Sequence, residues 1–143
     1  QKVVEDLTTL YQKRIAHYIN FEVRFLAPVK TKGKISPEQL KQKEAELILS
    51  KLATTDLLVL LDEKGKKMDS ITFAAQVGHW RQSSKKRVFF LIGGGFDNEI
   101  YQRADHQLAL SPMTFSHQVI RIIFLEQLYR AFTIINNEPY HNA

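Results

Sequence analysis

The stretch Leu108–His141, LALSPMTFSHQVIRIIFLEQLYRAFTIINNEPYH, decides how the rest of the chain must be arranged. A short apolar run, Leu108–Leu110, is followed by a turn at Ser111–Pro112 and by a long helix predicted from about Ser116 to Ile135. Apolar side chains surround this helix almost completely, whereas a surface helix shows one apolar stripe. We therefore expect it to be covered on two sides, by its own sheet and by a second subunit in a homodimer.

Composition indicates one globular domain spanning residues 1–143. The hydrophobic fraction of 44% is that of a folded chain, and the chain contains no cysteine. The lack of cysteine fits an intracellular location, and we expect a cytoplasmic protein. Three charged residues interrupt the long helix, which excludes a membrane span. The net charge of +5 permits a polyanionic partner such as nucleic acid, although a lysine-rich soluble protein has the same charge.

The first third of the chain predicts two helices and one strand. Apolar spacing favours a helix over Val3–Tyr18, and strict alternation predicts a half-buried strand at Phe21–Phe25. A helix starts after Ser36, because serine caps and proline suits the first turn. It runs to about Ala53, and its predicted buried residues are Leu40, Leu47, Ile48 and Leu52.

The remaining chain alternates strands with helices, which predicts a parallel α/β sheet with flanking helices. Leu57–Leu61 and Val88–Ile92 are continuous apolar strands, as expected where helices cover both faces. Helices are predicted at Ser70–Gln82 and at Asn98–Asp105, and Leu108–Leu110 is a further strand. Ligands bind at the carboxyl ends of such strands. Here those ends are followed by Asp62–Gly65, Gly93–Gly95 and Ser111–Thr114.

Motifs for the common chemistries do not occur. A dinucleotide fingerprint needs glycine at position 98, which is Asn98, and the Gly-Lys-Ser/Thr of a phosphate loop is missing. The five histidines lack the HExxH spacing of a zinc site, and there is no GxSxG nucleophile turn. We therefore expect no metal. Gly93–Gly95 fits either a nucleotide-like cofactor or a simple tight turn.

Several motifs together resemble the RlmH family of the SPOUT superfamily. They are LLVLLDEKGK (Leu57–Lys66), VFFLIGG (Val88–Gly94), LSPMTFSHQVIR (Leu110–Arg121), EQLYRA (Glu126–Ala131) and PYH (Pro139–His141). Members of this family are bacterial enzymes that transfer a methyl group from S-adenosylmethionine to N3 of a pseudouridine in large-subunit ribosomal RNA. The resemblance implies a C-terminal trefoil knot, a homodimer, and large-subunit rRNA or the ribosome as partner.

The resemblance also implies the cofactor site, which coincides with the three strand ends chosen above. The S-adenosylmethionine contacts fall on Leu61, Gly93, Leu110, Ser111, Pro112, Met113, Thr114 and Phe115. Backbone groups of such loops can bind the adenine edge and the methionine part without charged side chains.

Three departures from the family pattern are visible. The family usually has one more strand before the first helix. This strand is absent here, which we interpret as truncation or disorder. The usual Gly-Gly-x-x-Gly loop reads Gly93–Gly94–Gly95–Phe96, and Asn142 stands where many members have Arg or Lys. A knotted RNA- or ribosome-binding module without catalysis is therefore the alternative function, and a flavodoxin-like nucleotide-binding domain is a weaker one.

The catalytic prediction concerns the tail. N3 of a pseudouridine carries a proton, and histidine exchanges protons near neutrality, so we expect His141 to act as base or substrate orienter. Tyr140 would pack against the ligands and the pair would close over the cofactor loops; a frayed terminus is the alternative. Phosphate contacts are predicted for Lys30, Lys32, Lys34, Arg121 and Arg130, although the lysines also fit a solvated face.

Overall fold

The computed structural model describes residues 2–142, and its sheet contains three parallel strands in the order β2-β1-β3. The strands are β1 (Asp56–Lys67), β2 (Arg87–Ile92) and β3 (His106–Ala109). The predicted parallel α/β sheet with flanking helices is confirmed.

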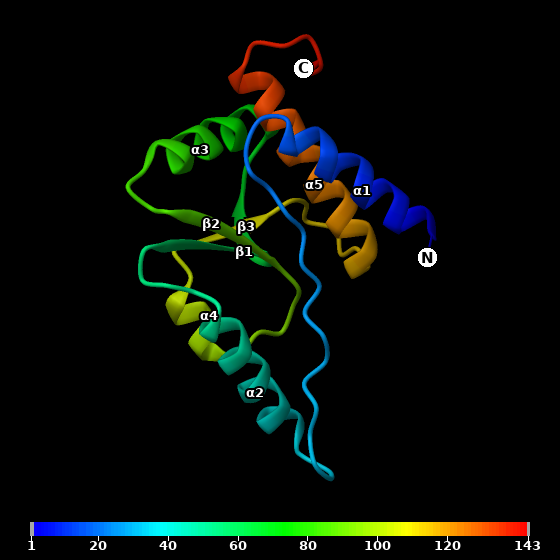
Figure 1. Ribbon diagram of the computed structural model, residues 1–143, viewed down its shortest axis with the longest axis vertical. Helices are drawn as coiled ribbons and strands as arrows, with labels where there is room; N and C mark the ends of the chain where they lie inside the picture. Colours follow the sequence, from blue (N-terminus) through cyan, green and yellow to red (C-terminus); the bar gives the residue numbers. More distant parts are fainter. Residues whose placement is uncertain (1, 143) are drawn as a thin grey trace.

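Five helices cover the two faces of this sheet. They are α1 (Lys2–Ala16), α2 (Pro37–Ser50), α3 (Ser70–Gln82), α4 (Asn98–Arg103) and α5 (His117–Ile135). α1, α3 and α5 lie on one face, and α2 and α4 lie on the other (Figure 1). The predicted bounds of α3 are confirmed, and those of α5 differ by one residue because Ser116 is its N-cap.

The continuous apolar run of β1 follows from burial on both faces. Alternate residues of a strand point to opposite faces. Leu57, Val59 and Leu61 pack into the core beneath α1, α3 and α5. Leu58 and Leu60 pack with α2 and α4 in a second core. Over Leu57–Leu61 neither face of β1 meets water, which explains why this part of its sequence does not alternate.

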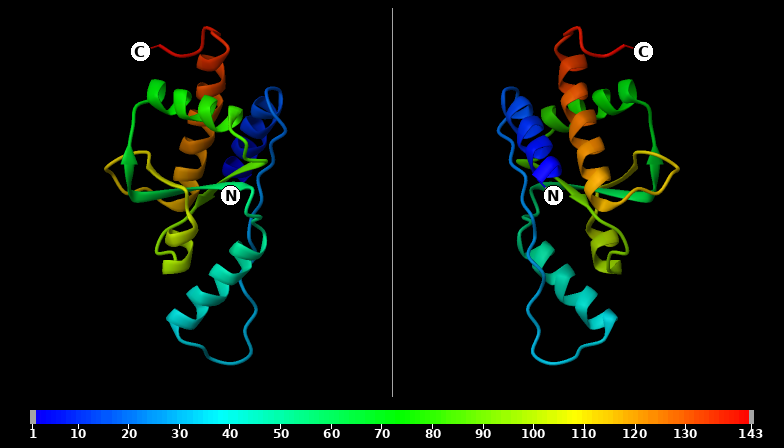
Figure 2. Two further views of the ribbon diagram at one scale, coloured as in Figure 1. Left: turned by 90° about the vertical axis from the view of Figure 1, so that its left-hand side faces the viewer. Right: turned by 90° about the vertical axis from the view of Figure 1, so that its right-hand side faces the viewer.

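The α2 helix begins as predicted, and of the residues predicted to be buried Ile48 and Leu52 do pack against the core. Ser36 Oγ accepts from the Gln39 N–H, and the Gln39 side chain accepts from the Ser36 N–H. The prediction of a buried Leu40 is wrong, since its side chain is 36% exposed and Ala45 is the buried residue. The first turns of α2 extend beyond the sheet (Figure 2), so only its second half contacts the core.

The strand predicted at Phe21–Phe25 is wrong. These residues belong to an extended connection between α1 and α2 that carries no strand assignment. The alternation is nevertheless meaningful, because Phe21 and Val23 are half-buried against the core while Glu22 and Arg24 are exposed. Alternation predicts which side chains are buried, but a strand also needs a neighbouring strand edge with which to pair.

The β1 strand continues well beyond its predicted end at Leu61. Leu61 pairs with Leu108 of β3, and after an irregularity Lys66 pairs with the same residue. Gly65 lies directly against this backbone: a Cβ added there would be 2.5 Å from the Leu108 nitrogen. The close approach of two chain segments therefore requires glycine at position 65.

The covering of α5 differs from the prediction. The sheet contributes as expected, since the rings of Phe90 and Phe124 lie 4.8 Å apart. The second side, which we assigned to a partner subunit, is packed largely by α1 and α3 of the same chain (Figures 1 and 2). Val119 remains 47% exposed on α5, and Val3 is 67% exposed on α1. The homodimer prediction must therefore rest on these residual apolar side chains.

Candidate functional site

The three predicted cofactor segments meet at one edge of the sheet. Leu61 pairs with Ile92 on one side and with Leu108 on the other. The loop Gly93–Gly95 leaves β2 immediately after Ile92, and the loop Leu110–Phe115 leaves β3 immediately after Ala109. Strand register thus places both loops beside the buried Leu61.

The β3–α5 loop exposes Pro112, Met113 and Thr114 to solvent. Ser111 Oγ accepts from the Met113 N–H at 3.0 Å, and Thr114 Oγ1 donates to Glu63 at 3.2 Å. Met113 is 71% exposed, which is unusual for so large an apolar side chain. The loop is therefore tied to the end of β1, and its exposed surface suits the apolar part of a ligand.

Glycine is needed at both ends of the 93–95 loop. A Cβ on Gly93 would lie 3.0 Å from the Phe96 ring, and Gly95 adopts φ +62°. A Cβ on Gly95 would lie 4.0 Å from Cε of Lys41, so α2 approaches this loop. The backbone here can approach a ligand more closely than a chain with side chains could.

One hydrogen-bonded pair near this edge of the sheet was not predicted from the sequence. The Tyr101 hydroxyl donates to the buried Asp62, whose other oxygen accepts from the Lys64 N–H at 3.2 Å. That hydrogen bond is the main reason that the pKa of Tyr101 is raised to about 12, with burial second. The pair fixes β1 just after Leu61. An aspartate directly after a buried strand was the available signal.

The C-terminal tail packs on the second half of α5. Arg130 donates to Glu126 at 2.7 and 3.1 Å, and its Nη1 lies 3.0 Å from Nδ1 of His141. The Tyr140 hydroxyl donates to Glu126 at 3.1 Å, and its ring stands edge-on to Tyr129. Burial, and then the charge of Glu126, raises the pKa of Tyr140 to about 12.

A second contact fixes the start of the tail. The Tyr18 hydroxyl donates to both oxygens of Glu138 at 2.8 and 2.9 Å. Burial, followed by this hydrogen bond, raises the pKa of Tyr18 to about 12. Tyr18 also stacks on Phe132 with the ring planes 6° apart. The tail is thus held at both ends, at Glu138 and at Tyr140–His141, which does not fit the alternative of a frayed terminus.

The tail and the cofactor loops lie at different ends of α5. The loop 110–115 leads into the start of the helix, while the tail leaves its far end (Figure 1) and returns to side chains of its second half, Glu126 and Arg130. Glu126 follows Ser116 by ten residues, which is about 15 Å along a helix. Within one chain, therefore, the tail does not close over Gly93–Gly95.

A hollow of about 310 Å³ lies between these two regions. Its lining includes Leu110 from the predicted cofactor loop and Asp69 at the start of α3. The pKa of Asp69 is lowered chiefly by the hydrogen bond from the Thr72 N–H, and also by the nearby His141. Leu110 and the start of α3 thus border one hollow, whose full lining is Met68, Asp69, Ser70, Phe73, Leu108, Leu110, Ile123 and Gln127.

Comparison with known proteins agrees with this geometry. A family model described as "Predicted SPOUT methyltransferase" matches residues 1–141. The chain belongs to the SPOUT methyltransferase family. The resemblance noted from the motifs is therefore confirmed over nearly the whole sequence.

Curated relatives of this SPOUT chain share one name, "Ribosomal RNA large subunit methyltransferase H". The protein of Christiangramia forsetii is 46% identical over 144 residues, covering 99% of this chain and 92% of the relative. That of Flavobacterium psychrophilum is 46% identical over 143 residues, covering 99% and 91%. That of Parabacteroides distasonis is 48% identical over 134 residues, covering 92% and 85%.

The basic residues that were predicted to contact RNA differ in exposure and in their partners on this SPOUT fold. Lys30, Lys32 and Lys34 are exposed on the connection before α2. Arg121 is half-buried and lies over the Phe25 ring, 4.5 Å from its centroid. Arg130 is occupied by Glu126 and His141, so its first role is to anchor the tail.

Two further properties of the SPOUT chain concern metals and membranes. Among residues 2–142, no three carboxylate, histidine or cysteine side chains gather as metal ligands would. No helix in that range is long and apolar enough to cross a membrane.

Proposed function

We propose that this protein methylates N3 of a pseudouridine in large-subunit ribosomal RNA, with S-adenosylmethionine as donor. The observation that carries the proposal is the register that brings the two loops to Leu61 in a chain of the SPOUT methyltransferase family. The names of the relatives favour rRNA as substrate, and such an enzyme would work in the cytoplasm. A binding module without catalysis is disfavoured, since these relatives are named as methyltransferases.

The residues present fit this cofactor. Leu61 and Leu110 offer an apolar floor, and the glycines at 93 and 95 leave backbone groups accessible. Ser111, Pro112, Met113, Thr114 and Phe115 complete the proposed site. The donor supplies a methyl group already activated on a sulfonium, so the protein's main task is to align the acceptor. For that task the chain offers the His141–Arg130 and Tyr140–Glu126 pairs.

Two measurements test this function. Calorimetric titration with S-adenosylmethionine should show binding, which the flavodoxin-like alternative does not predict. Transfer of labelled methyl to free rRNA, large subunits and whole ribosomes should then give product with at least one of them. Cofactor binding without transfer to any of the three would favour the non-catalytic module.

The proposal includes the trefoil knot and the homodimer that the family resemblance implies. Exposed apolar side chains on α1 and α5, namely Val3, Leu10 and Val119, give a partner subunit a surface to cover. A partner would also bring a second tail, which could reach the loops that this chain's own tail does not.

We expect the protein to sediment as a dimer at micromolar concentration, with twice the mass of the 16.6 kDa chain. Replacing Val3 and Val119 with Asp should shift it toward monomer, because burying unpaired carboxylates is costly. Replacing the exposed Ile71 on α3 with Asp is the matched control. A wild-type monomer at this concentration would contradict the prediction.

We expect affinity for the RNA substrate to fall steeply with salt, because phosphate contacts release counterions. The contributing residues are Lys30, Lys32, Lys34 and Arg121, with Arg130 available only if it leaves Glu126. Replacing the three lysines with Gln should reduce the slope of log affinity against log salt by about 2 for single-stranded RNA. A slope unchanged by the triple substitution would show that these lysines form only a solvated face.

A further inference from the structure

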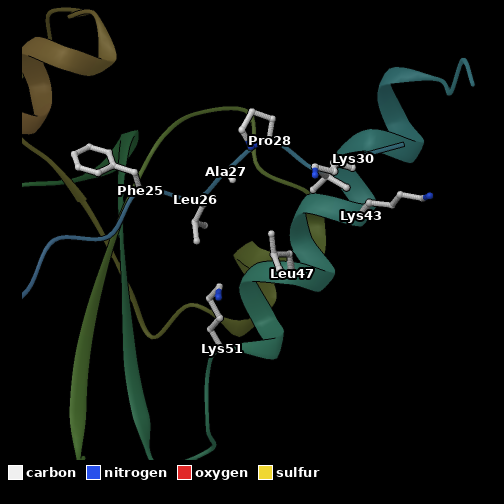
Figure 3. A pocket seen from close by; sticks show the side chains of 9 residues that line it. Phe25, Leu26, Ala27, Pro28, Lys30, Lys43, Leu47 and Lys51 are labelled. Atoms are coloured by element: carbon white, nitrogen blue, oxygen red, sulfur yellow. The ribbon is translucent and has the colours of Figure 1, made fainter. Parts of the chain in front are cut away.

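A groove outside the predicted cofactor site runs between the 25–30 segment and α2. Its volume is about 490 Å³, within the range of ligand pockets. Figure 3 shows Leu26 and Leu47 facing each other across it. The lining residues are Phe25, Leu26, Ala27, Pro28, Val29, Lys30, Lys43, Leu47 and Lys51.

The floor of this groove is apolar and accessible. Phe25 is 62% exposed and Leu26 is 41% exposed, although both are large hydrophobic residues. One face of the Phe25 ring is occupied by the Arg121 guanidinium. Because most of Phe25 is exposed, a flat ligand can stack on its ring.

The rim is positively charged. Lys43, Leu47 and Lys51 recur every four residues, so they share one face of α2. Lys30 approaches from the other wall, while Lys43 points outward from the rim (Figure 3). Among residues 2–142, none of these three lysines forms an ion pair with a carboxylate. Their charges are therefore available to an anionic ligand.

Two contacts connect the elements that line the groove with those of the proposed methyl-transfer site. On one side Lys41 of α2 approaches Gly95 of the glycine loop. On another side Arg121 joins Phe25 to the first turns of α5, directly after the loop 110–115. A strand of nucleic acid with its target at those loops would therefore have neighbouring nucleotides within reach of the groove.

We propose that this groove binds an unpaired nucleotide next to the target, as part of a single-stranded RNA segment. The base stacks on Phe25 and the apolar floor, and the phosphates lie at Lys30, Lys43 and Lys51. Apolar and aromatic surface bordered by unpaired cations is the pattern by which proteins bind single-stranded RNA. Duplex RNA keeps its bases stacked inside and cannot use the floor. The inference rests on the proposed function.

The test uses the purified protein and a short fluorescent oligouridine, with binding followed by anisotropy. Phe25→Ala should weaken binding about tenfold, the typical loss when a stacked base loses its aromatic partner. Lys43→Gln together with Lys51→Gln should weaken it and reduce the salt slope by about 1.4, that is 0.7 for each phosphate. Lys85→Gln with Lys86→Gln, which removes the same charge from an exposed loop elsewhere, is the control.

Two further comparisons separate this groove from general electrostatics. Phe25→Ala should leave duplex RNA binding nearly unchanged, because a duplex offers no free base. In methyl transfer the groove variants should raise KM for the RNA substrate, leave kcat near wild type and leave S-adenosylmethionine affinity unchanged. Thermal melting of each variant should match wild type, since the replaced side chains are exposed or lie at the rim.

Some results would overturn the inference. One such result is that the Phe25→Ala variant binds oligouridine as tightly as wild type, or loses affinity equally for single-stranded and duplex RNA. Another is that the control pair, Lys85→Gln with Lys86→Gln, weakens binding as much as the groove pair does. If both groove variants methylate RNA as wild type does, the proposed role of the groove is refuted and the proposed function remains. A wild-type protein that binds oligouridine through Phe25 but transfers no methyl group would refute the proposed function while the groove stands.

Discussion

Replacement of His141 with alanine is expected to slow methyl transfer about a hundredfold or more, the usual contribution of a positioned proton-transfer group. The acceptor nitrogen of the proposed substrate carries a proton that must leave before its lone pair can attack. S-adenosylmethionine affinity should hardly change, because the proposed cofactor contacts are Leu61, Gly93 and the loop 110–115 and include no residue of the tail.

The contact with Arg130 refines the role of this histidine. A guanidinium only donates hydrogen bonds, so Nδ1 of His141 must accept at 3.0 Å and the ring proton lies on Nε2. In this arrangement the imidazole offers a donor to the substrate, which is the orienting role. To act as a base, its Nδ1 lone pair must first be released from Arg130.

Two variants distinguish these roles. His141→Gln retains an N–H donor and should recover part of the rate if the residue orients the substrate, whereas a base would be lost with either substitution. The pH-rate profile should lose an ionisation only in the base case. His79→Ala, at an exposed position on α3, is the control. An unchanged rate for His141→Ala would mean that the proton goes directly to water and the tail is only a cover.

The edge of the sheet that carries the site could be predicted, because the sequence pattern of each strand by itself indicates how that strand is buried. Leu57–Leu61 and Val88–Ile92 are apolar without alternation, and helices separate them, so a doubly covered parallel sheet is the arrangement that buries both. The carboxyl ends of such strands meet at one edge. Leu61, Gly93 and Leu110 were therefore expected to lie close together.

The contact that fixes the start of the tail could not be predicted because it joins residues far apart in sequence. Tyr18 and Glu138 are separated by 120 positions, and neither has a pattern that indicates the other. The extension of β1 past Leu61 was missed for a related reason. The last residues of β1 are mostly polar and exposed, so hydrophobic periodicity does not predict that they pair with β3.

Gly65→Ala is expected to lower the free energy of unfolding by about 3 kcal/mol, toward the upper end of overpacking effects. The added Cβ would lie 2.5 Å from the Leu108 nitrogen and 2.7 Å from the Gln107 and Leu108 carbonyl carbons. All three are backbone atoms of β3 and its approach, so no side chain can rotate away. Relief requires β1 and β3 to separate where their pairing resumes, at Lys66 and Leu108.

The matched control is Gly78→Ala, inside α3. A Cβ there would meet only the Ile135 side chain at 4.0 Å, which is ordinary contact. Alanine should therefore stabilise the protein by about 1 kcal/mol, because it favours the helix over glycine. Urea unfolding followed by circular dichroism measures both variants. Opposite shifts of the two midpoints would support a tight crossing at Gly65. Equal midpoints for Gly65→Ala and wild type would show that β1 and β3 lie farther apart there and would contradict the tight contact at Gly65.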